Sequence, residues 1–108
     1  MEEELELKKL IGLLNKANSE LPKRAREYAY AYKQYRMILS KELLLERDKG
    51  TPVTIISDIV RGKESVANAK ELEIITEGLY VSCKEAINSY KVQIKILKES
   101  INNEMENS

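Results

Sequence analysis

The sequence predicts an all-α protein: a long antiparallel helical hairpin, coiled-coil-like, that assembles into a helical-bundle oligomer. Gly and Pro together contribute only six of the 108 residues, while 33% of the chain is charged and 43% is apolar. Apolar residues recur every three or four positions in two long stretches, as they do in amphipathic helices. This composition is typical of long helices and not of a β-sandwich or a doubly wound sheet. We expect residues 1–108 to form a single helical domain.

The first helical segment is expected over residues 2–49. Its apolar stripe changes register by about one residue near Pro22. The stripe consists of Leu7, Leu10, Leu14, Ala17 and Leu21, followed by Ala25, Tyr28, Tyr32, Tyr35, Leu39 and Leu43. Proline removes one helical hydrogen bond and crowds the preceding turn. The segment is therefore either one helix kinked at Pro22 or two helices, the second with Ser19 as N-cap.

A connector is expected over residues 50–62. Gly50 follows a basic turn and predicts a left-handed C-cap. Ser57 and Asp58 are candidates to cap a single helical turn ending near Gly62. The connector is too apolar for a free loop, because it holds Val53, Ile55, Ile56, Ile59 and Val60. These aliphatic residues either cap the end of the hairpin or contact a partner.

The second long helix is expected over residues 63–105. Two apolar rows make its face too wide for one partner helix, which favours self-association. The rows consist of Leu72, Thr76, Leu79, Cys83, Ala86, Tyr90, Ile94, Leu97 and Ile101, and of Ile75, Tyr80, Ile87 and Ile94. The candidate oligomer seam is Leu72, Leu79, Cys83, Ile87, Tyr90, Ile94 and Leu97. A turn centred near Ile56 would place Gly78 opposite Gln34, where it either receives a tyrosine ring or is a tolerated surface glycine.

The composition argues against an enzyme. Without His and with one Cys, the chain lacks the residues for His-ligated metal sites and for Ser-His-Asp or Cys-His catalysis. Glu73 and Glu77 are spaced like a carboxylate pair but are expected to be solvated at the surface, and Cys83 is expected to be a buried structural thiol. We expect no cofactor, no metal and no small-molecule substrate. The sequence shows neither a membrane span nor a secretory signal, so we expect a cytoplasmic protein that does not bind membranes.

A local excess of positive charge stands out in a chain whose net charge is zero. The candidate belt for nucleic acid or a protein partner is Lys23, Arg24, Arg26, Tyr30, Lys33 and Arg36. Cations interleaved with aromatic rings bind phosphates and stack bases. Tyr28, Tyr32 and Tyr35 share the apolar stripe and are expected to pack in the core, whereas Tyr30 points away from it. The alternative is that these cations only solvate a helix face.

Two groups of residues stand out. One begins at Thr51-Pro52-Val53-Thr54, continues through Asp58–Gly62 and Glu77-Gly78-Leu79-Tyr80, and ends in Cys83-Lys84-Glu85-Ala86-Ile87-Asn88. The other is the Tyr-Ala-Tyr-Ala-Tyr run with Tyr35-Arg36. Both resemble a group of small helical phage and prophage proteins of low-GC Gram-positive hosts. The resemblance covers residues 25–101. It implies helical structure and a phage context near single-strand annealing and recombination genes, and it supplies no catalytic residues.

These observations favour a non-enzymatic protein that acts by binding in phage DNA replication or recombination. Its expected partners are other copies of itself and either a phage DNA-handling protein or single-stranded DNA. One alternative is an anti-defence inhibitor that docks on a host immune protein, which the apolar connector would suit. Another is a structural scaffold or assembly factor.

Overall fold

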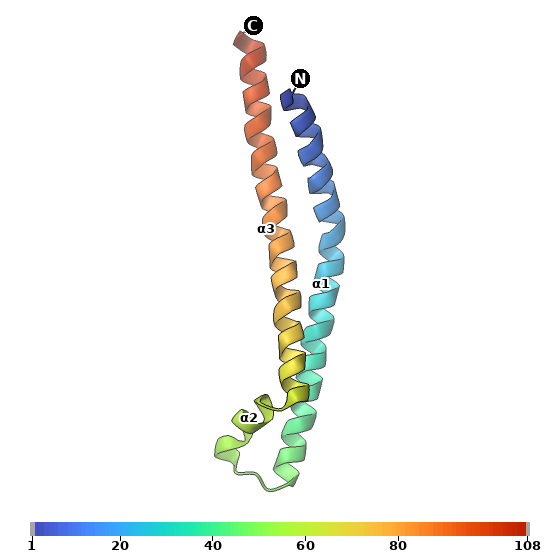
Figure 1. Cartoon of the computed structure of the whole chain (residues 1–108), viewed down its shortest axis with the longest axis vertical. Helices are drawn as coiled ribbons and strands as arrows, with labels where there is room; N and C mark the ends of the chain where they lie inside the picture. Colours follow the sequence, from blue (N-terminus) through green and yellow to red (C-terminus); the bar gives the residue numbers. More distant parts are fainter. Residues whose placement is uncertain (1, 108) are drawn as a thin grey trace. The chain divides into compact units, whose positions relative to one another are not determined.

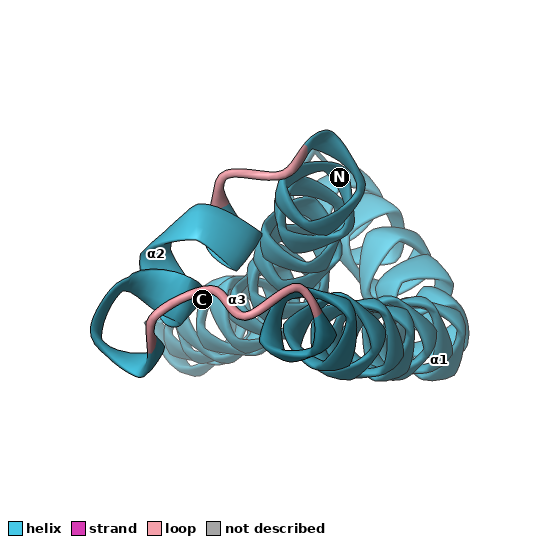
Figure 2. Cartoon of the chain, turned by 90° about the horizontal axis from the view of Figure 1, so that it is seen from below, coloured by secondary structure: helices cyan, strands magenta, loops and turns pink. Residues whose placement is uncertain are grey.

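The computed structural model describes residues 2–107, and helices make up 94% of them. Helix α1 spans Glu2–Asp48, α2 spans Val53–Arg61 and α3 spans Glu64–Asn107 (Figure 1). Figure 2 shows loops only on the two sides of α2, and no β-strand occurs within residues 2–107. Helix α1 packs against α3 in a hairpin-like arrangement. The predicted all-α class is therefore confirmed.

The contacts divide the chain into two compact units. The first combines residues 2–24 with residues 80–107, and the second comprises residues 25–79. Both units pair a part of α1 with a part of α3, and only the second contains α2. Each unit is described separately below.

In the first unit, the predicted stripe of α1 forms the contact with α3. Leu10 and Ala17 of α1 are buried, as are Ile87 and Ile94 of α3. The half-buried Cys83 also belongs to this contact, because its Sγ donates a hydrogen bond to the carbonyl oxygen of Ala17 at 3.4 Å. The thiol was expected to be buried, and the structure places it half-buried at this contact.

Helix α1 continues through Pro22 without a break. The hydroxyl of Ser19 donates a hydrogen bond to the carbonyl oxygen of Lys16 at 2.7 Å, so Ser19 does not cap a second helix. The exposed Pro22 ring lies on the solvent side of α1. The sequence allowed either one helix through Pro22 or two helices, and the structure has one continuous helix.

In the second unit, α1 keeps the same three- and four-residue spacing as far as Ile38, so the change of register predicted near Pro22 is wrong there. Leu39 and Leu43 of the predicted stripe do pack against the core. The residues turned inward are Arg24 at the end of the first unit and then Tyr28, Ala31, Tyr35 and Ile38 in the second. Tyr32, which was expected on this stripe, is 48% exposed. The three- and four-residue spacing therefore continues without interruption from Leu10 to Ile38, and Arg24 occupies one of its inward positions.

Helix α3 also follows a regular heptad that differs from the predicted stripe. Its inward positions in the second unit are Val66, Ala69, Glu73 and Thr76, and in the first unit Tyr80, Cys83, Ile87, Tyr90, Ile94, Leu97 and Ile101. Leu72 and Leu79, which were assigned to the stripe and to the oligomer seam, are exposed instead. The rest of the predicted seam lies on the inward heptad within one chain, where its residues are buried or half-buried: Cys83, Ile87, Tyr90, Ile94 and Leu97. Glu73 was expected at the surface but is only 6% exposed, and its carboxylate accepts a hydrogen bond from Lys70 at 3.1 Å.

The connector contains a nine-residue helix and closes the core of the second unit. Val60 of α2 packs with Tyr35 of α1 and Val66 of α3, and Ile56 lies against the same cluster. Helix α2 begins directly after Pro52, so the expected start at Ser57-Asp58 is wrong. Gly50 has φ +84°, which confirms the predicted left-handed C-cap of α1.

Helix α2 also shifts the pairing of α1 with α3. Lys70 of α3 lies over the Tyr35 ring with its Nζ 4.8 Å from the centroid. A turn centred at Ile56 would have placed Lys70 opposite Glu42, about two helical turns away. The pairing differs from the expected one because α2 runs back beside the end of α1 before α3 begins (Figure 1). Gly78 has no atom near the position of a Cβ, so it receives no tyrosine ring.

Candidate binding surfaces

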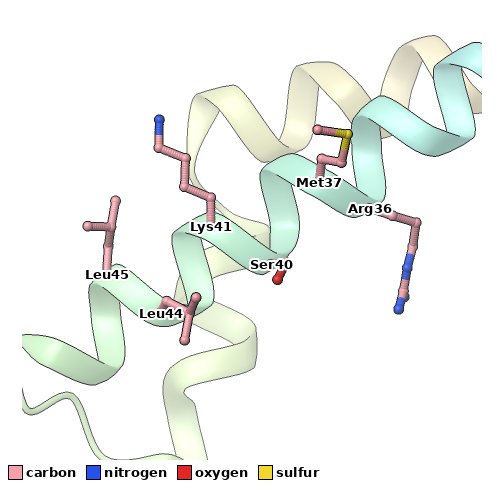
Figure 3. A pocket seen from close by; sticks show the side chains of 6 residues that line it. All are labelled: Arg36, Met37, Ser40, Lys41, Leu44 and Leu45. Atoms are coloured by element: carbon pink, nitrogen blue, oxygen red, sulfur yellow. The ribbon is translucent and has the colours of Figure 1, made fainter.

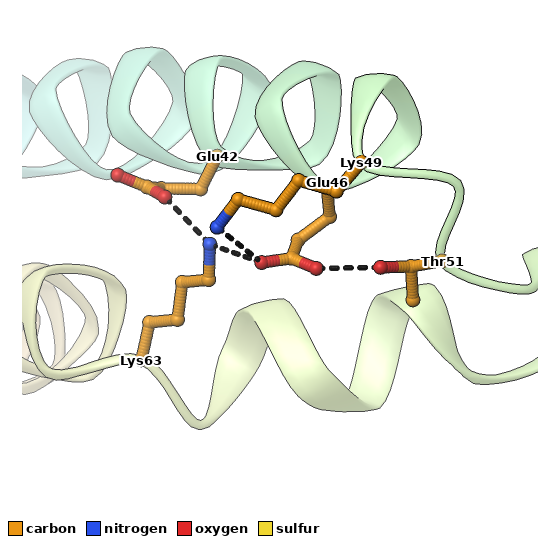
Figure 4. A network of polar contacts seen from close by, with 5 residues as sticks. All are labelled: Glu42, Glu46, Lys49, Thr51 and Lys63. Atoms are coloured by element: carbon orange, nitrogen blue, oxygen red, sulfur yellow. Dashed lines mark hydrogen bonds and ion pairs between the residues drawn. The ribbon is translucent and has the colours of Figure 1, made fainter.

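The end of α1 is tied to the start of α3 by a network of charges (Figure 4). The Nζ of Lys63 lies 2.7 Å from Glu46 Oε1 and 2.9 Å from Glu42 Oε2. Thr51 Oγ1 donates a 2.6 Å hydrogen bond to Glu46. The hydrogen bonds from Lys63 and then Thr51 lower the pKa of Glu46 from its ordinary 4.5 to about 2. Two of the acidic residues of α1 are thereby held against Lys63.

We expect Lys63→Met to lower the melting temperature at neutral pH, because Glu46 would remain buried without its main partner. The ionised Glu46 stabilises the fold above pH 4.5, and this contribution is lost as the pH falls toward about 2. The difference between wild type and variant should therefore shrink over that range in thermal melts followed by circular dichroism. Lys49→Met is the control, because Lys49 also contacts Glu46 but is largely exposed. A difference independent of pH would contradict this role of Glu46.

The cations of α1 in the second unit lie on the side of the helix away from α3. Arg26, Lys33, Arg36 and Lys41 are all exposed. None of them forms an ion pair with another residue in the described range 2–107. From Arg26 to Lys41 the sequence contains one acidic residue, Glu27, and it is half-buried, so this stretch of α1 carries an excess of exposed positive charge.

Tyr30 lies among these cations and is 63% exposed. Arg26 precedes it by four residues and Lys33 follows it by three, so all three side chains share one side of the helix. We call Arg26, Tyr30, Lys33 and Arg36 the basic surface. The structure confirms the prediction that Tyr30 points away from the core.

The predicted belt is longer than the basic surface. Lys23 and Arg24 belong to the first unit, and Arg24 is half-buried and engaged in a polar or ring contact. Arg24 therefore does not lie on the freely solvated side of the helix. The side chains of the other four predicted residues are all exposed on α1: Arg26, Tyr30, Lys33 and Arg36.

Sequence reasoning missed the apolar residues that continue along this side of α1. Met37, Leu44 and Leu45 are exposed and line a shallow groove with Arg36, Ser40 and Lys41 (Figure 3). Tyr30, Met37 and Leu44 follow one another at intervals of seven residues. This heptad spacing is the signal that could have revealed a second, outward-facing row.

The aliphatic residues of the connector divide into buried and exposed ones. Val60 is fully buried and Ile56 half-buried, so these two close the core of the second unit. Val53, Ile55 and Ile59 remain exposed on α2, where they are accessible to a partner.

Within residues 2–107, no group of acidic and cysteine side chains could hold a metal ion. None of the described helices combines the length and the apolar character that a membrane span requires. No protein-family model, curated protein or solved structure matches the chain.

Proposed function

We propose that this chain acts by binding and not by catalysis, as an accessory protein of phage DNA replication or recombination in the host cytoplasm. The observation that carries the proposal is the basic surface, whose three cations have no ion pair among the described residues. The phage context is taken from the resemblance of residues 25–101. Single-stranded DNA is the proposed ligand of the basic surface.

The chemistry of the basic surface suits a single strand. Arg26, Lys33 and Arg36 are positioned to neutralise successive phosphates, and these contacts release bound counterions. The exposed ring of Tyr30 offers a face on which any base can stack. The neutral charge of the whole chain does not oppose this binding, because the acidic residues nearby on α1 face the interior or Lys63.

The affinity for single-stranded DNA should therefore fall with salt. Three phosphate contacts predict a slope of about −2 for the logarithm of the association constant against the logarithm of the salt concentration. Tyr30→Ala should weaken binding by about 1–3 kcal/mol without changing that slope. Fluorescence anisotropy with labelled oligodeoxythymidylate measures both values. No binding at about 50 mM salt, where electrostatic contacts are strong, would refute the DNA proposal.

Self-association is the second part of the proposed function. Leu72, Ile75 and Leu79 form an exposed apolar row on α3 in the second unit. Gly78 lies within this row, and the open space around it leaves room for a second backbone to approach. A second copy of the chain is the proposed partner of this row, since packing helices on it would bury the apolar side chains.

Ile75→Glu should therefore convert the assembly to a monomer of 12.4 kDa. The isoleucine is half-exposed within one chain, so the helices themselves should remain folded. Light scattering at several protein concentrations measures the mass, and circular dichroism checks the helices. Ile96→Glu, on the exposed part of α3 in the first unit, is the matched control. A wild-type mass of 12.4 kDa at every concentration would exclude self-association.

The exposed aliphatic residues of α2 favour a second candidate function. Val53, Ile55 and Ile59 would suit docking on a host immune protein, as in an anti-defence inhibitor, or on a structural partner as a scaffold. Affinity purification from infected cells, with and without nuclease, distinguishes these functions. Partners lost on nuclease treatment support the DNA role, and one nuclease-resistant immune protein supports the inhibitor.

A further inference from the structure

A shallow groove lies on α1 beyond the basic surface, within the second unit (Figure 3). Its apolar lining consists of Met37, Leu44 and Leu45, of which Met37 is 57% and Leu44 55% exposed. Single exposed apolar residues are ordinary on protein surfaces. Here Leu44 and Leu45 are adjacent in sequence, and Met37 lies two helical turns before Leu44, with Ser40 and Lys41 on the turn between them. We call these three apolar side chains, which line one groove and are in contact with water, the strip.

The charged residues that line this groove, Arg36 and Lys41, are both positive, and the exposed Asp48 lies one helical turn beyond Leu44 and Leu45. The side chains of Arg36 and Lys41 extend away from the helix on opposite sides in Figure 3. The nearest acidic residues of α1 on the chain, Glu42 and Glu46, are bound to Lys63 at 2.9 Å and 2.7 Å. Within the described residues, neither Arg36 nor Lys41 has an ion pair. A ligand that covers the strip therefore meets two uncompensated positive charges.

We infer that this groove binds an acidic amphipathic segment of a partner protein. The apolar side chains of a short helix would lie on Met37, Leu44 and Leu45, in the way that amphipathic helices occupy apolar grooves. Its carboxylates would reach Arg36 and Lys41, and the guanidinium of Arg36 matches the geometry of a carboxylate. The flexible thioether of Met37 adapts to different apolar side chains.

The groove differs from the basic surface in the ligand that it suits. Single strands bind through rings on which bases stack, and the groove lining contains no aromatic side chain. Its aliphatic side chains instead require an apolar partner. The inference goes beyond the proposed function and shares only Arg36 with the basic surface, so the two sites are separable by mutation.

The test uses the full chain and two labelled synthetic helical peptides. One peptide carries leucines on one face and glutamates beside them, and the other has serine in place of each leucine. The leucine peptide should bind at least about tenfold more tightly than the serine peptide, because only its leucines can pack on the apolar side chains of the groove. A tenfold difference in affinity corresponds to about 1.4 kcal/mol of binding free energy. Met37→Ser combined with Leu44→Ser, and separately Lys41→Glu, should each reduce its binding by a similar factor.

Oligodeoxythymidylate binding measured on the same variants distinguishes the two sites. The Met37→Ser, Leu44→Ser protein should still bind the oligonucleotide, and Arg26→Glu with Lys33→Glu should still bind the leucine peptide. Equal binding of both peptides, no peptide binding, or unchanged binding after the groove substitutions would overturn the inference. It would also be overturned if the groove substitutions lowered the mass of the wild-type assembly, because a second copy would then occupy the groove.

Discussion

Tyr35→Ala should lower the free energy of unfolding by about 3–5 kcal/mol, the range for removing a large buried aromatic side chain. Tyr35 lies at the centre of the only cluster that joins all three helices in the described second unit, against Val60 and Val66. Its loss would also remove the ring beneath Lys70. Urea denaturation followed by circular dichroism measures the change.

Tyr32→Ala is the matched control, because the hydrophobic pattern placed Tyr32 and Tyr35 on the same stripe. In the structure Tyr32 is exposed and Tyr35 is buried. The control should cost less than about 1 kcal/mol, as surface substitutions usually do. Equal losses for the two variants would show that the register of α1 described above is wrong.

Arg26→Glu combined with Lys33→Glu should weaken single-stranded DNA binding by at least about tenfold, since two phosphate contacts are replaced by two repulsive charges. Both residues are exposed and have no ion pair with described residues, so helicity should not change. Anisotropy at low salt measures the affinity, and circular dichroism measures the helicity.

Lys91→Glu combined with Lys95→Glu provides the control with the same change of net charge. These two lysines are exposed on α3 in the first unit. Their reversal should alter the affinity little if DNA contacts the basic surface. A loss of equal size in both double variants would mean that DNA responds to the total charge and not to a site on α1.

The fold class and the two long helices could be predicted from composition and spacing, but the face of each helix could not be predicted fully. Apolar residues alone led to Leu72, Leu79 and Tyr32, which are exposed. The inward heptads contain polar residues that the predicted stripes lacked, Arg24 on α1 and Glu73 on α3. A polar residue at an inward position interrupts an apolar pattern even when its partner, here Lys70 for Glu73, makes its burial favourable.

The candidate site was predictable where it depends on local charge. The sequence predicts the basic surface, because helical geometry places Arg26, Tyr30, Lys33 and Arg36 on a different side of α1 from the tyrosines that face inward. Whether Arg24 faces inward depends on its position in the heptad of α1. The existence of the groove depends on which of Leu43, Leu44 and Leu45 face outward. Neither could be assigned before the register of α1 was known, and that register depends on long-range packing with α2 and α3.

An amide NMR titration of the full chain with oligodeoxythymidylate at low salt tests most directly whether the basic surface is a DNA-binding site. The account predicts chemical-shift changes confined to α1 around Arg26, Tyr30, Lys33 and Arg36, and their disappearance in the Arg26→Glu, Lys33→Glu variant. Changes centred on the lysines of α3, or no changes at all, would contradict it.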